Sequence, residues 1–474
     1  MIMTILRDNV RFVLLLLAGV FLLACGKDGD MPLTPPGEDE IPPEEVVPEV
    51  PEEEYLSPYV VSSAVMTFCY YDIEGQIDTL EQRIDFNMEV YGTDTPDLRN
   101  IPLKLVTRDG FEAENVKDGV VTMTLSTRKA TRISFIKDTC TVDYDIYVTP
   151  VVKEAPATEF NIHAGVNLSY WFQEDVPWPE YETLEQIAKY GFDHVRLPFD
   201  TKVIFNQLGV INRENMDELR QVVDRCLELG LLVILDMHWL EAGNLFYQEP
   251  AAQELVSNWK NLMGEFSKYP NEMLAYEILN EPHGPGWELM QRRMTHLIRH
   301  SEPARVLFVS PDGYNAEGAS KFYLHKGDPN MIITFHYYEP MLASHRKSWG
   351  YTGPSHYPGL LFSDAEWDAM SEANREIAQW HRGNVYDYEY AYNKMKAAAE
   401  TAAQNGLRLH CGEFGYSKSN IWEERVQWFR DVVKAFNDNG IVYTTWENWG
   451  GDFGPGDWAS RPDEEIIGIL LQKD

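Results

Sequence analysis

Two glutamates could share acid/base chemistry, because each follows a short apolar run. Glu281 stands in Asn280-Glu281-Pro282 after the run Leu274–Leu279, and Glu413 follows the run Arg408–Cys411. Two facing carboxyl groups can divide such work when one is kept protonated and the other ionised. The alternative is that both are ordinary surface acids among the 75 acidic residues of the chain. Their position after apolar runs argues against that alternative, so both are candidate catalytic residues.

Other polar and aromatic residues stand at or just after further apolar runs. They are Arg196, His238, His336, Tyr338 and Trp446. A buried guanidinium needs an acidic partner, so Arg196 is expected to pair with carboxylates. A histidine at a strand end is often only a hydrogen-bonded core residue, and a tryptophan is often only packed. Those structural alternatives stay open for His238, His336 and Trp446.

The sequence contains eight such apolar runs, and helical stretches fall between most of them. The runs are His163–Leu168, His194–Leu197, Leu231–Asp236, Leu274–Leu279, Arg305–Val309, Ile332–Phe335, Arg408–Cys411 and Ile441–Thr445. One helix is marked by apolar residues between Met216 and Leu227 and by Gly230 at its end. The repeat predicts an α/β fold, a (β/α)8 TIM barrel over residues 157–474, with its site at the carboxyl ends of the strands.

The sixth connection of this barrel, from Glu339 to about Tyr386, is long and rich in aromatic residues. It carries Trp349, Tyr351, Tyr357 and Trp367. Long loops with such side chains are usually functional, so we expect this one to build part of the binding face.

The first residues are typical of an export signal. Arg7 and Arg11 precede the apolar stretch Phe12–Ala24, which is short for a membrane helix, and Cys25 follows it directly. We expect residues 1–24 to be a lipoprotein signal peptide and Cys25 to be lipidated. The protein would then be a secreted lipoprotein of the outer membrane, on the cell surface. An ordinary secretion signal that contains a cysteine is the alternative.

Between this signal and the barrel, two further segments are expected. Residues 25–57 are rich in proline and glutamate and predict an extended acidic linker. Residues 58–153 show the period-two alternation of strands, as in Ile84, Phe86 and Met88, and predict a small all-β immunoglobulin-like sandwich. All 13 tryptophans lie at Trp171 or later, which favours a structural spacer over a carbohydrate-binding module.

The five cysteines are expected to play different parts. Cys69 and Cys140 fall in the same predicted β domain and could form a disulfide in an oxidising compartment. Cys226 and Cys411 lie on predicted buried faces, where a free thiol is expected.

Six segments together resemble glycoside hydrolase family 5. They are Val195-Arg196-Leu197-Pro198, Asp236-Met237-His238, Ile278-Leu279-Asn280-Glu281-Pro282, Phe335-His336-Tyr337-Tyr338, Gly412-Glu413-Phe414-Gly415 and Thr445-Trp446. The resemblance covers residues from about 158 to the C-terminus. It implies a retaining mechanism in which Glu281 is the acid/base and Glu413 the nucleophile.

The resemblance also implies roles for the supporting residues. Arg196 and Tyr338 would hydrogen-bond the nucleophile, and Asn280 would bind the sugar 2-hydroxyl. His336 would lie near Glu281, and His238 would orient its neighbours. Trp446 would form the floor under the sugar being cut. The implied substrate is a polysaccharide, cut internally at β-1,4-glucosidic bonds of cellulose-type glucans. A β-mannanase or xyloglucanase of the same family is the alternative.

Composition and motifs limit the other functions. A formal net charge of -35 repels nucleic acid, so no nucleic-acid partner is expected. Asp236 and His238 could bind a metal, but no strand-one His-x-His is present, and we expect neither metal nor cofactor. The chain lacks a Gly-x-Ser-x-Gly segment. A non-catalytic glycan-binding lipoprotein is the remaining rival, and a monomer is expected.

Overall fold

The computed structural model describes residues 60–92, 95–173, 178–206, 209–243, 246, 248–346, 350–457 and 459–472. The signal peptide, Cys25 and the acidic linker therefore lie outside the described residues. Residues Ser57–Asp474 form one compact unit. Among the described helices, none combines the length and the apolar character that a membrane crossing requires.

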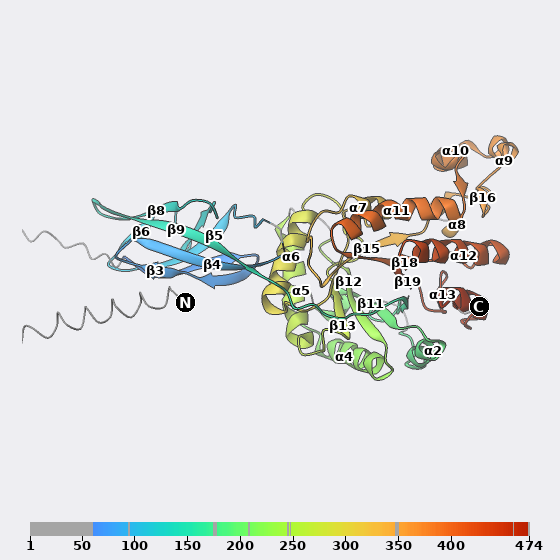
Figure 1. Ribbon diagram of the computed structural model, residues 1–474, viewed down its shortest axis with the longest axis horizontal. Helices are drawn as coiled ribbons and strands as arrows, with labels where there is room; N and C mark the ends of the chain where they lie inside the picture. The colour runs from blue at the N-terminus through green and yellow to red at the C-terminus, as the bar shows by residue number, and fades with distance from the viewer. Residues whose placement is uncertain are drawn as a thin grey trace, which may run out of the picture. The chain divides into compact units, whose positions relative to one another are not determined.

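Eight parallel strands close into a barrel (Figure 1). They are β10 (Ala164–Asn167), β11 (His194–Asp200), β12 (Leu232–Trp239), β13 (Leu274–Glu277), β14 (Leu307–Val309), β15 (Met331–Tyr337), β18 (Arg408–Phe414) and β19 (Val442–Thr445). Each predicted apolar run overlaps one of them. Barrel strands are covered on both faces, which is why they appear as nearly continuous apolar runs. The predicted (β/α)8 fold is confirmed.

Helices follow the strands around the barrel (Figure 1). They include α2 (Glu182–Tyr190), α3 (Thr201–Ile204), α4 (Arg213–Glu228), α5 (Glu249–Phe266), α6 (Trp287–Ser301), α7 (Ala316–Ser320), α11 (Tyr388–Gln404), α12 (Trp422–Asp438) and α13 (Glu464–Leu470). Helix α4 is the one expected around Met216–Leu227. The Asn212 side chain caps its first turn by accepting a hydrogen bond from the Asn215 N–H. Gly230 has φ +79°, the left-handed conformation that glycine provides after a helix.

The region before the barrel contains two β-sheets. One has the order β2–β1–β5–β7 and the other β3–β4–β9–β8–β6. The strands are β1 (Val61–Phe68), β2 (Tyr71–Glu74), β3 (Gln76–Asp78), β4 (Arg83–Tyr91), β5 (Ile101–Thr107), β6 (Glu112–Ala113), β7 (Val120–Met123), β8 (Thr131–Lys137) and β9 (Cys140–Lys153). The predicted alternation in β4 is confirmed, since Ile84, Phe86, Met88 and Val90 are all buried. The region is β-rich, and its immunoglobulin-like arrangement stays a prediction.

The suggested disulfide between Cys69 and Cys140 is absent, and both are free thiols. Cys69 lies in the turn between β1 and β2, whereas Cys140 begins β9 of the other sheet. Two cysteines can pair only when their Cα atoms lie within about 7 Å, and sequence alternation does not report that distance. Cys226 and Cys411 are buried free thiols, as expected.

The turn between β1 and β2 contacts two helices of the barrel. The Tyr71 ring stacks on His300 of α6 with ring centroids 4.0 Å apart. Nζ of Lys260 in α5 donates to the backbone oxygen of Tyr70 at 2.6 Å. Phe68 packs edge-on against His296, also in α6. These contacts fasten the β-rich region to the barrel through aromatic packing and a hydrogen bond.

The long sixth connection forms small elements of its own. They are α8 (Met341–Ser344), β16 (Gly359–Leu360), α9 (Asp364–Ala369), α10 (Glu372–Ala378), η2 (Gln379–His381) and β17 (Val385–Tyr386). Of its four noted aromatic residues, Trp349 lies outside the described residues and Tyr351 and Tyr357 are buried. The Tyr351 hydroxyl bonds Pro354 within the connection, whereas the Tyr357 hydroxyl bonds Asp431 of α12, so neither tyrosine is available to a ligand. Trp367 is half-buried, with Arg382 over its ring.

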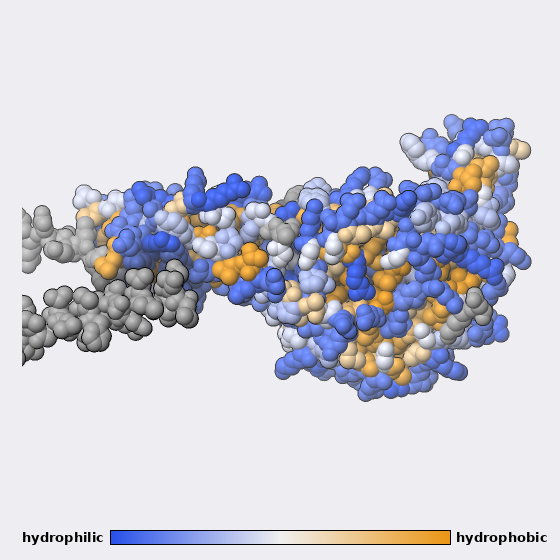
Figure 2. All heavy atoms as spheres, viewed as in Figure 1, coloured by the Kyte–Doolittle hydropathy of each residue, from blue (hydrophilic) through white to orange (hydrophobic). Residues whose placement is uncertain are grey.

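Hydrophilic residues cover most of the visible face, while apolar residues gather in patches over the barrel and near β16 (Figure 2). Near β16, Leu360 pairs across the strands with Val385, and both are exposed.

Candidate active site

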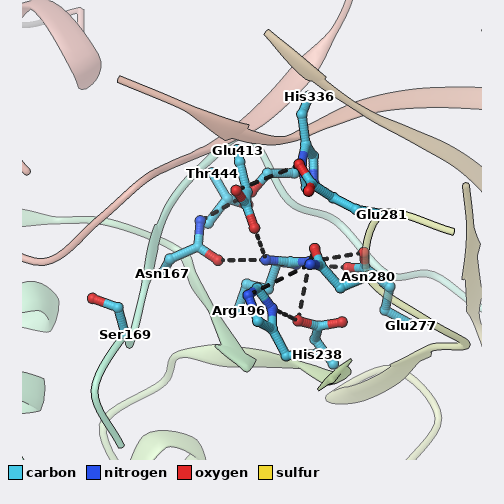
Figure 3. A network of polar contacts seen from close by, with 12 residues as sticks. Asn167, Ser169, Arg196, His238, Glu277, Asn280, Glu281, His336, Glu413 and Thr444 are labelled. Atoms are coloured by element: carbon cyan, nitrogen blue, oxygen red, sulfur yellow. Dashed lines mark hydrogen bonds and ion pairs between the residues drawn. The ribbon is translucent and has the colours of Figure 1, made fainter. Parts of the chain in front are cut away.

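Arg196 stands at the centre of a buried polar network inside the barrel (Figure 3). Nε and Nη2 donate to the two carboxylate oxygens of Glu277 at 2.7 and 3.0 Å. Nη1 donates to Asn167 at 2.9 Å and to Glu413 Oε1 at 2.8 Å. Nη2 also reaches the Asn280 amide oxygen at 2.8 Å. Every guanidinium nitrogen is thus bonded, and the expectation of acidic partners for Arg196 is confirmed.

Glu413, at the end of β18, is held by two donors. Its Oε1 accepts from Arg196, and its Oε2 accepts from the Tyr338 hydroxyl at 3.0 Å. His336 Nδ1 lies 3.5 Å from the same Oε2. The carboxylate is nearly buried, and the neighbouring guanidinium stabilises its negative charge. Such a fixed, desolvated carboxylate is suited to attack an electrophilic carbon.

Glu281 follows β13 and lies in a different environment. Its Oε1 is 2.7 Å from His336 Nδ1, and its side chain is 35% exposed. Burial raises the pKa of the Glu281 carboxyl, although nearby His238 and Arg196 oppose the shift. Burial also lowers the pKa of His336 to about 4, so its imidazole is neutral at higher pH. A carboxyl with a raised pKa can donate a proton near neutral pH.

The Glu281 backbone has φ +43°, a left-handed conformation that is unusual for a side chain other than glycine. Residues in this region are held there by the surrounding structure and concentrate at functional sites. In Figure 3 the carboxyl groups of Glu281 and Glu413 point toward one another. A carboxylate oxygen of one lies within 4.8 Å of a carboxylate oxygen of the other.

His238 and Trp446 form a stacked pair beside these carboxylates. Their ring centroids are 5.4 Å apart and their planes differ by 9°. Nδ1 of His238 is 2.7 Å from Asp236, and Nε2 is 3.5 Å from the Asn280 amide nitrogen. Trp446 is only partly buried, so its ring is available at the site. The structure therefore brings all eight predicted site residues into one cluster.

Two residues of the cluster were missed in the sequence. Glu277 is completely buried and holds Arg196 through two hydrogen bonds, and Asn167 joins Arg196 to the backbone of Gly412. A signal for Glu277 was present, because it is a charged residue inside the apolar run Leu274–Leu279. Asn167, also within an apolar run, offered a weaker signal of the same kind.

Four other tryptophans, Trp171, Trp239, Trp287 and Trp449, could each contact a sugar or pack in the core. Trp171, Trp287 and Trp449 are buried and pack in the core. Trp239, the last residue of β12, is 60% exposed. Only Trp239 of these four presents a ring to solvent at the carboxyl end of a barrel strand.

Glu281, His336 and Glu413 could together offer ligands to a metal ion, since one atom of each lies within 4.8 Å of the others. A cation there would share Glu413 with Arg196, whose permanent positive charge lies 2.8 Å from the carboxylate. Repulsion between two adjacent cations disfavours metal binding. The geometry suits two carboxyl groups acting directly.

Comparison with known proteins identifies the family. Residues 152–452, more than half of the chain, match the sequence profile described as Cellulase (glycosyl hydrolase family 5). The chain belongs to glycosyl hydrolase family 5. Endoglucanase C of Acetivibrio thermocellus is 26% identical over 349 residues, which cover 65% of this chain and 98% of that protein. Cellodextrinase A of Ruminococcus flavefaciens is 25% identical over 300 residues, covering 58% and 82%.

Solved endoglucanase structures resemble the barrel as well. An endoglucanase has a TM-score of 0.55 at 26% identity and covers 66% of this chain and 97% of its own. A hyperthermophilic endo-β-1,4-glucanase, solved with substrate, has a TM-score of 0.53 at 25% identity, with coverage of 66% and 97%. The protein is therefore a cellulase-like glycoside hydrolase with endoglucanase-like function.

Proposed function

We propose that this family 5 enzyme is a retaining endo-β-glycanase that cuts internal β-1,4-glucosidic bonds. The approach of the Glu281 and Glu413 carboxylate oxygens to within 4.8 Å carries the proposal. Retaining glycosidases hold their carboxyl groups about 5–5.5 Å apart, whereas inverting enzymes need roughly 6.5–9.5 Å to admit a water molecule. The separation in this site suits direct attack by one carboxylate.

In the first step Glu413 attacks the anomeric carbon, and Glu281 gives its proton to the leaving glycosidic oxygen. The bond between the two sugars breaks, and a covalent bond forms between the sugar and Glu413. In the second step Glu281, now ionised, removes a proton from water. The water oxygen attacks the same carbon and releases Glu413. Each step inverts the configuration at the anomeric carbon, so the two steps together retain it.

The surrounding residues support these two roles. Arg196 and Tyr338 hold Glu413 through both of its oxygens. Arg196 also fixes the amide oxygen of Asn280, which leaves the amide nitrogen to donate to a sugar 2-hydroxyl. His238 is set by Asp236 and stacks on Trp446, whose indole offers a face to the pyranose. His336 Nδ1 lies 2.7 Å from Glu281 Oε1 and positions its carboxyl group.

The preference for a β-1,4-glucan comes from the names of relatives such as Endoglucanase C and from that of the solved endo-β-1,4-glucanase. A β-mannanase or xyloglucanase would use the same two carboxyl groups. The test compares purified enzyme on carboxymethyl-cellulose, mixed-linkage glucan, xyloglucan and glucomannan. A rapid fall in viscosity before reducing ends accumulate on carboxymethyl-cellulose is the expected result. If the enzyme turned over none of these four substrates, the alternative of a non-catalytic glycan-binding protein would be favoured.

A chelator distinguishes direct carboxyl catalysis from metal-assisted hydrolysis. Activity is expected to survive prolonged treatment with EDTA, because neither step needs a cation. A complete loss that zinc or calcium restores would contradict the assignment.

We also propose that the mature enzyme is a monomer anchored in the outer membrane through lipid on Cys25, facing the outside of the cell. The charged start, the apolar stretch and the cysteine directly after it support this location. Residues 25–57 would act as a tether, since their acidic charges repel one another and favour an extended chain. A polysaccharide is too large to enter the cell, so a surface enzyme would meet its substrate there.

A further inference from the structure

A pocket lies between helix α6 and the segment that follows β14. Its volume is 220 Å³, and its lining includes Trp287, Glu288, Gln291, Asp312, Phe322 and Tyr323. None of these residues belongs to the active-site cluster. Trp287, Gln291 and Phe322 are buried and form the floor, whereas Glu288, Asp312 and Tyr323 are exposed and form the mouth. The pocket is thus a hollow with an apolar floor and a polar rim.

The floor carries a hydrogen-bond acceptor without a partner. Gln291 is 1% exposed, and its Nε2 donates to the backbone oxygen of Ser310 at 2.6 Å. Trp287 Nε1 donates to the same oxygen at 2.9 Å. Because a carbonyl oxygen can only accept, this bond fixes which end of the Gln291 amide is nitrogen. The remaining atom, Oε1, is buried and has no hydrogen-bond partner.

A buried acceptor without a partner is costly, and native structures rarely leave one unless something binds there. We infer that the Gln291 pocket binds one neutral sugar unit, whose hydroxyl donates to Oε1. This inference goes beyond the proposed hydrolysis, because the pocket lies outside the catalytic cluster. The sugar has two possible sources, a free monosaccharide or a side-chain sugar on the polysaccharide.

The size and chemistry of the pocket favour this ligand. The volume of 220 Å³ is several times the roughly 30 Å³ share of one water molecule. It is smaller than the roughly 300 Å³ at which pockets for drug-sized ligands begin. Among the charged lining residues, Glu288 and Asp312 outnumber Lys321, which is itself paired with Glu317, so the mouth disfavours anions. The rings of Tyr323 and Phe322 suit the C–H face of a sugar. A neutral ligand with hydroxyl donors meets all of these conditions.

The mouth is bridged by one hydrogen bond and joined to the catalytic loop by two others. The Tyr323 hydroxyl donates to Glu288 at 2.8 Å, linking the two walls. The Gly284 N–H donates to Asp312 at 2.9 Å, and the Gly313 N–H donates to the Pro282 oxygen at 3.3 Å. Pro282 directly follows Glu281. A sugar in the pocket would therefore order the loop that carries the acid/base.

The experiment uses the full chain labelled with 5-fluorotryptophan and follows the Trp287 signal by ¹⁹F NMR, assigned with Trp287→Phe. D-Glucose and D-xylose are titrated separately. The Trp287 signal is expected to shift saturably with at least one of them. In Gln291→Met, which keeps the side-chain length but removes the acceptor, binding should weaken roughly five- to tenfold. Tyr323→Ala, a change at an exposed residue, should weaken it as well without disturbing the floor.

The source of the sugar is tested with a branched xyloglucan oligosaccharide and linear cellotetraose, both added to Glu281→Gln to prevent turnover. Tighter binding of the branched compound at Trp287 indicates a side-chain sugar, and binding of free sugars alone indicates a monosaccharide. A Trp287 signal that no sugar shifts, or that shifts equally in the wild type and in Tyr323→Ala, would overturn the inference. Binding is read without catalysis, so its failure leaves the hydrolase proposal unaffected, and the reverse also holds.

Discussion

Nη1 of Arg196 lies 2.8 Å from Oε1 of Glu413, with side-chain exposures of 0% and 7%. The same guanidinium also lies 3.0 Å from Asp236 and 2.7 Å from Glu277. Three carboxyl groups therefore converge on one buried cation. Burial raises the pKa of Asp236 to about 7 and also raises the pKa of Glu277. The one cation does not fully offset the burial of its acidic partners, so its loss would leave buried negative charge without compensation.

Arg196→Lys is accordingly expected to impair both stability and activity. Lysine keeps the charge but cannot make the forked contacts to Glu277 and Glu413. Breaking a buried ion pair typically lowers the free energy of unfolding by roughly 3–5 kcal/mol. Urea unfolding measures this loss, and Arg213→Lys, at an exposed pair with Glu265, is the control. Equal unfolding midpoints for the two variants would contradict a central role for Arg196.

Glu281→Gln should lose activity in a way that depends on the leaving group. Turnover of β-glucan is expected to fall about 10²–10⁴-fold, the usual contribution of general acid catalysis. An aryl glycoside with an acidic phenol needs little protonation, so its first step should be affected far less. Equal losses on both substrates would argue that Glu281 is not the acid.

The pH profile provides an independent test of Glu281. Because burial raises its pKa, the protonated, acidic form persists to higher pH than in an exposed glutamate. Activity should therefore decline on the alkaline side as Glu281 loses its proton. The rate of the first step with the aryl glycoside, measured in Glu281→Gln, should lack that alkaline decline. An alkaline decline that persists unchanged in Glu281→Gln would show that another group causes it.

Glu413→Gln should abolish the first step on both kinds of substrate. A good leaving group can make protonation unnecessary, but it cannot take the place of the missing nucleophile. Tyr338→Phe is the graded companion, since it removes one donor to Glu413 and leaves Arg196 in place. We expect it to lower kcat/KM by roughly ten- to a hundredfold, as one hydrogen bond to a charged group contributes about 1.5–3 kcal/mol. Rates near wild type for Glu413→Gln would refute its assignment.

The sequence predicted the barrel well because strands covered on both sides appear as unbroken apolar runs. The positions after those runs then indicated Arg196, Glu281 and Glu413. Glu277 was missed because a charged residue inside such a run looks like an interruption until its partner is known. The burial of Tyr351 and Tyr357 depends on how the long connection folds on itself and packs against α12, which a local sequence pattern does not report. The pairing of cysteines depends on distance in the same way.

Removing the β-rich region should separate its structural part from its catalytic part. Every proposed catalytic residue lies at or beyond Arg196, so a chain starting at Pro156 should keep its rate on a short soluble oligosaccharide. It should melt at a lower temperature, because Tyr71 no longer stacks on His300. Loss of the oligosaccharide rate with the fold intact would contradict this division of roles.

The same truncated chain also tests for a carbohydrate-binding function. If the β-rich region is only a spacer, the rate of the truncated chain relative to the full chain should be the same on insoluble polysaccharide and on the oligosaccharide. A loss confined to the insoluble substrate would indicate that the β-rich region binds glycan.

Anchoring at Cys25 predicts that mature protein from the native host partitions into the detergent phase of a two-phase extraction. Cys25→Ala should move it to the aqueous phase. Identical partitioning of both forms into water would exclude the lipid anchor.

The configuration of the first-formed product tests the central claim most directly. The enzyme is mixed with a β-1,4-linked cello-oligosaccharide, and the anomeric protons are followed by ¹H NMR before mutarotation equilibrates them. Two displacements at one carbon, with Glu413 as nucleophile and Glu281 as acid/base, predict that the β-anomer appears first. Initial formation of the α-anomer would mean a single displacement by water and would contradict the proposed mechanism.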